Sequence, residues 1–92
     1  MSKIFKYKLK VTDMQVIALP AMHQILSAQV QRGEICVWAR VWEDTPLVSK
    51  WFYIFGTGHA IADGIPMDFI DTVQMHDGSL IFHVFCGGNK HA

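Results

Sequence analysis

The stretch that decides the fold class is FIDTVQMHDGSLIFHVFC, which spans residues 69–86. Two runs in which apolar and polar residues alternate, 69–76 and 79–86, flank the dipeptide Asp77-Gly78. Alternation with a period of two is typical of a half-buried strand, and Asp-Gly suits the type I′ turn of a tight hairpin. The segment therefore predicts two antiparallel strands.

The same alternation continues toward the amino terminus, and no stretch shows helical spacing. Further strands are expected at residues 3–11, 14–19, 25–31, 35–42 and 48–55. We predict an all-β chain: a small antiparallel β-sandwich or barrel-like domain of about six or seven strands, with at most one short helical turn. Residues 1–86 form this single domain, and residues 87–92 are expected to be a flexible tail.

Composition excludes several classes of function. Among 92 residues, eight basic side chains balance eight acidic ones, so no net positive charge attracts duplex DNA. No apolar run approaches the roughly 20 residues that would span a bilayer. Cys36 and Cys86 lie in predicted strands, which fits a reduced, cytoplasmic setting. An apolar fraction of 51% exceeds the average for soluble domains and indicates self-association.

Two central strands carry large apolar side chains on both faces. Trp38 and Arg40 lie opposite the aliphatic face of residues 35–41, and Trp51 and Tyr53 lie opposite Phe52. If one face packs in the core, the other is free to form a subunit interface or a ligand platform. Because aromatic residues and arginine are enriched in interfaces, we favour the subunit interface.

An aromatic strand runs directly into a turn with two glycines, Gly56-Thr57-Gly58-His59. Backbone N–H groups of such a turn can hold an anion, and an imidazole lies nearby. The spacing does not match a nucleotide-binding loop, because no helix follows. The favoured interpretation is a tight turn with positive φ at both glycines, and the alternative is a ligand contact through His59 and Thr57.

Neither catalysis nor metal binding has a recognisable pattern. The histidines and cysteines lack zinc-ligand spacing, so we predict no metal and no cofactor. His83 is expected to be a packing residue. The aspartates lie in or near turns, where they commonly cap the backbone, and no nucleophile has an adjacent base. We therefore predict no catalytic residues, and the chain is more consistent with a binding protein than with an enzyme.

A stripe of lysines, Lys6, Lys8 and Lys10, lies along one face of the first strand. Charged residues on an edge strand discourage edge-to-edge aggregation, and this is the favoured interpretation. The alternative is that the stripe joins Arg40 or Lys50 of a neighbouring subunit to form an anion-binding cleft.

Specific blocks extend over nearly the whole chain, and the two most specific are Gly56-Thr57-Gly58-His59 and Phe82-His83-Val84-Phe85. With Val11-Thr12-Asp13 and Val37-Trp38-Ala39, they resemble a family of small uncharacterised proteins, a domain of unknown function, encoded by bacteriophages and prophages. The resemblance implies an accessory protein in the cytoplasm of the bacterial host. It implies no established activity.

Together these patterns give one leading hypothesis. A homo-oligomeric, non-enzymatic phage protein would sequester a small anionic or nucleotide-like signalling molecule and so counter host defence. The ligand-binding residues would come from three groups: the rings of Trp38, Trp51 and Tyr53, the cation of Arg40, and the turn residues Gly56, Thr57, Gly58 and His59. The alternative is a protein-protein interaction module that inhibits a host protein or belongs to the virion.

Overall fold

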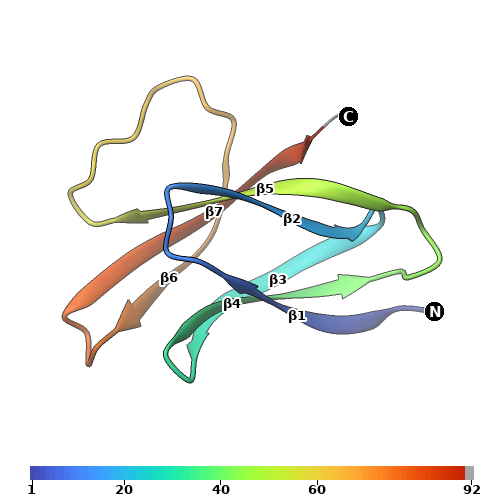
Figure 1. Cartoon of the computed structure of the whole chain (residues 1–92), viewed down its shortest axis with the longest axis horizontal. Coiled ribbons are helices and arrows are strands. Elements are labelled where there is room, and N and C mark those ends of the chain that lie inside the picture. The colour runs from blue at the N-terminus through green and yellow to red at the C-terminus, as the bar shows by residue number, and fades with distance from the viewer. Residues whose placement is uncertain (91–92) are drawn as a thin grey trace.

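A computed structural model describes residues 1–90, with side chains described for residues 1–88. Seven strands follow one another, and the described residues contain no helix. They are β1 (Lys3–Leu9), β2 (Met14–Pro20), β3 (His23–Gln31), β4 (Glu34–Val41), β5 (Leu47–Gly56), β6 (Asp68–Met75) and β7 (Leu80–Lys90). The prediction of an all-β chain is confirmed, and each expected strand is present (Figure 1).

The strands form two antiparallel sheets. Sheet A has the order β1-β4-β3, and sheet B has the order β2-β5-β7-β6. The chain changes sheet between β1 and β2, between β2 and β3, and between β4 and β5. The last two connections support each other, because Ala21 N–H donates to Pro46 O at 2.7 Å and Trp42 N–H donates to Met22 O at 3.1 Å. The arrangement is a β-sandwich.

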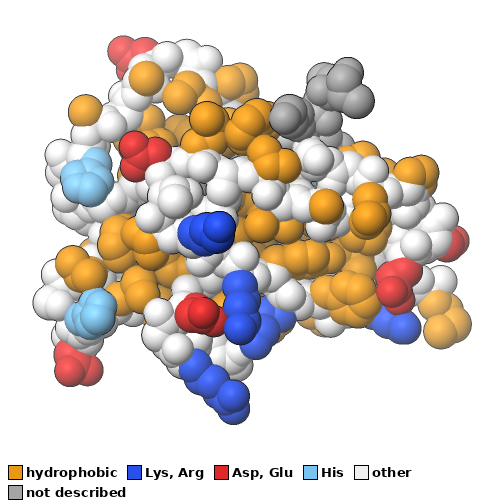
Figure 2. Space-filling model, in the orientation of Figure 1, with side chains coloured by type: hydrophobic (Ala, Val, Ile, Leu, Met, Phe, Trp, Pro, Cys, Tyr) orange, Lys and Arg blue, Asp and Glu red, His pale blue; other side chains and the backbone are white. Residues whose placement is uncertain are grey.

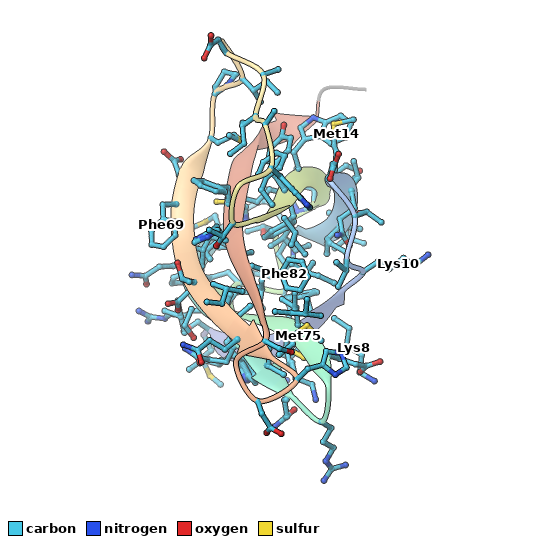
Figure 3. All side chains as sticks on the ribbon, turned by 90° about the vertical axis from the view of Figure 1, so that its left-hand side faces the viewer. Lys8, Lys10, Met14, Phe69, Met75 and Phe82 are labelled. Atoms are coloured by element: carbon cyan, nitrogen blue, oxygen red, sulfur yellow. The ribbon has the colours of Figure 1, made fainter. Side chains whose placement is uncertain are left out.

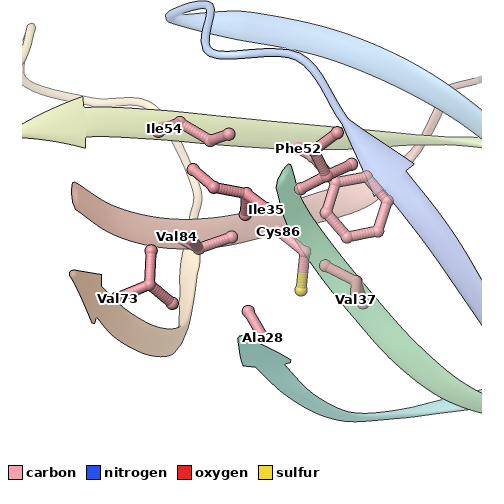
Figure 4. Packing of buried hydrophobic residues seen from close by; sticks show 9 residues of the cluster. Ala28, Ile35, Val37, Phe52, Ile54, Val73, Val84 and Cys86 are labelled. Carbon is pink, nitrogen blue, oxygen red and sulfur yellow. The ribbon is translucent and has the colours of Figure 1, made fainter. Parts of the chain in front are cut away.

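The core lies between the inner faces of the two sheets (Figure 4). Sheet A contributes Ile35 and Val37, which are completely buried, and sheet B contributes Phe52, Val84 and their neighbours. Alternation along a strand then directs Trp38 and Arg40 to the outer face of sheet A. By the same rule, Trp51 and Tyr53 project from the outer face of sheet B.

One side of the sandwich is closed by its two bulged edge strands. β3 has an extra residue at Leu26 and β6 has one at Ile70, and these strands lie close together. The bulge in β6 is followed by Asp71, whose carboxylate accepts hydrogen bonds from Ala28 N–H at 3.3 Å and from Gln29 Nε2 at 3.4 Å. This carboxylate therefore satisfies an N–H group that the edge of β3 would leave unpaired.

Two hairpins are present, and the one predicted at residues 69–86 differs in the detail of its turn. Arg32 and Gly33 have positive φ between β3 and β4. Between β6 and β7, His76 and Asp77 have φ of 52° and 55°, and Gly78 N–H donates to Met75 O at 3.2 Å. The central pair of this turn is thus His76-Asp77, one residue before the expected Asp77-Gly78. Gly78 also has positive φ and completes a longer loop.

Strand β7 continues beyond Cys86 to Lys90, where the sequence predicted a tail. Lys50 pairs with Asn89 and Phe52 pairs with Cys86, so Gly87 and Gly88 together oppose Trp51 in a bulge. Glycine at this place reads as a chain end in the sequence but permits a close approach in the fold. His91 and Ala92, the rest of the expected tail, lie outside the described residues.

We expect the stability of the fold to fall as the pH rises above about 8.5, the ordinary pKa of a thiol. Burial raises the pKa of Cys86, an effect that Lys50 opposes and Asp68 reinforces, and burial together with Glu43 raises the pKa of Tyr7. The unfolded chain therefore loses these protons at a lower pH than the folded chain does. The stabilisation that each raised pKa contributes is fully present below the pKa of the unfolded chain. It is lost as the pH rises to the pKa of the folded chain.

Urea unfolding between pH 7 and pH 10 measures this effect. One thiol limits the slope to about 1.4 kcal/mol per pH unit. Cys86→Ala is expected to be less stable at pH 7 but to show a shallower decline. An equal decline in the two proteins would contradict the assignment to Cys86.

Candidate functional site

The structure divides the expected ligand-binding residues between opposite sides of the molecule. β4 and β5 follow each other in the sequence but belong to different sheets. Trp38 and Arg40 therefore lie on sheet A, while Trp51, Tyr53 and the glycine turn belong to sheet B. One chain does not bring these groups to a single ligand. Figure 3 shows the two outer sides, with Phe69 projecting from one and Lys8 lying toward the other.

The outer face of sheet A combines an indole ring with cations. Lys6 is the cross-strand partner of Trp38, and Arg40 is two residues further along β4 on the same face. Directly opposed side chains have Cβ atoms about 5 Å apart, and residues i and i+2 of a strand lie about 7 Å apart. Trp38 is partly exposed and thus accessible between two positive charges.

Neighbouring groups hold both cations in place. Lys6 Nζ donates to Gln31 Oε1 at 2.7 Å, and Arg40 Nε donates to Ser2 Oγ at 2.7 Å. The Arg40 guanidinium also lies 4.7 Å from the ring centroid of Trp42, within the range of a cation–π interaction. The ligand-binding residues expected from the sequence did not include Trp42.

The nearby carboxylates are engaged with other lysines. Glu34 pairs with Lys8 at 3.1 Å, and Glu43 pairs with Lys3 at 3.0 Å. Across residues 1–88, no ion pair involves the side chain of Lys6 or Arg40. We define the cationic face as Lys6, Trp38, Arg40 and Trp42. It presents an aromatic surface and two charges that carboxylates leave uncompensated.

The outer face of sheet B is aromatic. Tyr53 and Phe55 stack with centroids 6.4 Å apart, and Phe85 makes edge contacts with Phe55 and Phe69 at 6.2 and 5.6 Å. We define the aromatic face as Tyr53, Phe55, Phe69 and Phe85. Phe69 is 59% exposed, whereas Tyr53 and Phe55 are buried.

The β5–β6 loop explains the burial of Tyr53 and Phe55. Ala60, Ala62 and Ile65 of this loop line a hollow of about 300 Å³ together with these two rings. Figure 1 shows the loop extending from the end of β5 before it returns to β6. Sequence alternation placed Tyr53 on an open face, because it could not show that a loop would return beside this ring.

The glycine turn is built differently from the expectation. Gly58 has a φ of 87°, but Gly56 belongs to β5 and its φ is not positive. Gly56 is small for another reason: a Cβ there would lie 3.1 Å from Cε1 of His59. Two N–H groups are already used, since Thr57 donates to Ile81 O and His59 donates to Gly56 O. The turn therefore has few donors left for an anion.

His83 is the better connected histidine of this region. Its Nε2 lies 2.8 Å from Thr57 Oγ1, and its Nδ1 lies 3.0 Å from Thr72 Oγ1. The imidazole thus joins β6 and β7 to the glycine turn, as expected for a packing residue with satisfied nitrogens. His59 lines a separate hollow of about 350 Å³ with Gly56 and residues 79–82.

The whole chain, residues 1–92, matches a family model described as Domain of unknown function (DUF7352). The chain belongs to this family. No curated protein and no solved structure matches it. Membership in DUF7352 assigns no activity, so a function has to be inferred from the geometry of the two faces.

No group of three or more histidine, cysteine, aspartate or glutamate side chains is arranged to hold a metal ion in the part of the chain that the structure describes. Residues 1–90 also contain no helix of the length and apolar character needed to cross a bilayer.

Proposed function

We propose that this member of DUF7352 is a non-enzymatic binding protein that captures a small nucleotide-like anion on its cationic face. The observation that supports the proposal is the position of Trp38 between Lys6 and Arg40. A planar base can stack on the indole ring while phosphate oxygens accept hydrogen bonds from the two cations. A face with two indole rings and two uncompensated cations suits a small ligand better than a duplex.

Preorganisation strengthens this assignment. Gln31 and Ser2 hold Lys6 and Arg40 through hydrogen bonds, so part of the side-chain ordering is complete before a ligand arrives. Guanidinium groups bind phosphate through paired N–H donors, and Arg40 has donors besides the Nε that faces Ser2. The ligand is placed here rather than at the glycine turn, where Thr57 and His59 N–H groups are already bonded.

The biological setting of the proposal comes from the resemblance to proteins of bacteriophages and prophages. In that setting the protein acts in the cytoplasm of the bacterial host as a homo-oligomer. It sequesters a signalling nucleotide and thereby interferes with a host defence response. Sequestration needs tight binding and no chemistry, which fits a face that has cations and rings but no nucleophile with an adjacent base.

Arg40→Gln is expected to weaken binding of the best ligand about 10- to 150-fold, because one charge-assisted hydrogen bond contributes about 1.5–3 kcal/mol. Isothermal titration calorimetry with a panel of mononucleotides and cyclic dinucleotides measures the change. Affinity should also decline with added salt, since the interaction is electrostatic and exposed.

The matched control is Lys10→Gln, which removes the same charge from the exposed connection between β1 and β2. Its affinity should equal that of the parent. Equal losses in both variants would indicate a general effect of net charge. Absence of nucleotide binding by the folded parent protein would refute the proposal.

A second function has its own supporting observation, the 59% exposure of Phe69 on the aromatic face. A protein partner, either a host protein or a virion component, would bury this ring together with the partly exposed Phe85. Figure 2 shows that hydrophobic side chains cover broad areas of the face it presents. A stable complex that Phe69→Asp abolishes and Arg40→Gln leaves intact would favour this function over nucleotide capture.

A further inference from the structure

Strand β2 is an edge strand of sheet B with an unusual composition. Its seven residues, Met14–Pro20, include no charged side chain. It pairs with β5 without a register shift, and proline occurs only as its last residue. An exposed edge that is regular and uncharged is a template for another strand.

The backbone of this edge has free capacity. In an antiparallel pair, alternate residues direct N–H and C=O groups away from the partner strand. Outside the ladder with β5, the described hydrogen bonds reach only the carbonyls at its two ends, Met14 O from Thr12 Oγ1 and Pro20 O from the His23 ring. From Gln15 to Leu19 the outward groups face no partner within the described chain.

The other three edges are protected. β1 carries Lys3, Lys6 and Lys8, which discourage pairing with another strand. β3 and β6 are bulged and lie against each other, and Asp71 accepts a hydrogen bond from the edge of β3. β1 and β2 do not approach each other in the way that β3 and β6 do. Among the described strands, β2 is therefore the edge that lacks protection against pairing with another strand.

We infer that β2 pairs with β2 of a second copy, antiparallel about a two-fold axis, and joins two B sheets into one. The inference rests on the homo-oligomer of the proposed function and specifies the interface between its subunits. When all seven residues pair, Ile17 lies on the axis and Val16 opposes Ala18 of the other copy. Outward side chains then meet apolar against apolar, without like charges, as a self-complementary interface requires.

The geometry leaves the cationic face accessible in such a dimer. Lys6, Trp38 and Arg40 belong to sheet A, so pairing through sheet B does not cover them. The partly buried Ile17 already faces the core of its own copy and is not needed for the contact. Dimerisation and nucleotide binding are therefore separate properties.

Sedimentation velocity over a concentration series tests the inference. The parent protein should show a monomer–dimer equilibrium, and its β2 amide protons should become protected from exchange as concentration rises. Ala18→Lys should weaken dimerisation about tenfold or more, because Ala18 is exposed and the two lysines then become diagonal neighbours across the axis, about 7–8 Å apart. Mixing Ala18→Lys with Ala18→Glu should restore the dimer.

Gln74→Lys is the matched control, since it adds the same charge to an exposed position of β6 at the opposite edge of sheet B. It should dimerise as the parent does. A parent protein that remains monomeric, or an Ala18→Lys variant that dimerises equally well, would overturn the inference. If the β2 amide protons became protected from exchange only when a different protein was bound, the inference would be overturned as well. Nucleotide affinity, measured separately, reports on the proposed function.

Discussion

Phe52→Ala is expected to destabilise the protein by about 3–5 kcal/mol, the range for removing a buried phenylalanine ring. Phe52 is 1% exposed and is the largest of the fully buried side chains. Figure 4 shows its ring in the space between the sheets. A domain of this length is stable by only about 5–15 kcal/mol, so the variant should approach the limit of folding. Urea unfolding followed by tryptophan fluorescence measures the loss.

Phe69→Ala is the matched control, because it removes the same ring from an exposed position of β6. Phe69 is 59% exposed, so the cavity term is absent and the loss should stay below about 1 kcal/mol. Losses of similar size in the two variants would mean that the core is not centred where the structure places it.

Gly87→Ala is expected to destabilise the protein by about 1–3 kcal/mol, the usual effect of adding a methyl group to a tightly packed place. A Cβ at Gly87 would lie 3.2 Å from Cβ of Trp51 and 3.2 Å from Cε2 of Tyr53. Both neighbours belong to β5, the central strand that pairs with β2 and β7. The added methyl group therefore pushes on a strand that has little freedom to move.

The adjacent glycine supplies the control for this prediction. A Cβ at Gly88 would meet no atom within 4 Å, and its φ does not favour glycine. Gly88→Ala should change stability by less than about 0.5 kcal/mol, or increase it slightly by restricting the unfolded chain. Thermal unfolding of both variants measures the difference. Two neutral substitutions would support the flexible tail expected from the sequence instead of the β7 bulge.

Local patterns predicted the elements well because strand formation depends on neighbours in the sequence. The alternation of residues 69–86 predicted β6 and β7, and the pattern of residues 35–42 predicted β4 with its correct inner face. The outward position of Trp38 followed from the same period of two. Local pattern also suggested that the lysine stripe protects an edge strand, and Lys6 and Lys8 do lie on an edge strand of sheet A.

The candidate site was less predictable, because it depends on which strands share a sheet. Trp38 and Trp51 seemed to belong to one surface, yet β4 and β5 lie in different sheets. Lys6 lies beside Trp38 and Arg40 because β1 pairs with β4, although about thirty residues separate them in the sequence. No local pattern records such a pairing, because it is selected by the packing of the complete sandwich.

The sequence by itself determined that this chain forms strands and where most of them lie. The physical reason is that the period of two and the turn residues act over a few neighbouring positions. Only the tertiary structure decided that β2 remains an unprotected edge, that the β5–β6 loop covers Tyr53 and Phe55, and that the cationic face is separate from the aromatic face. Those features depend on contacts between distant segments, and such contacts exist only after both sheets have packed together.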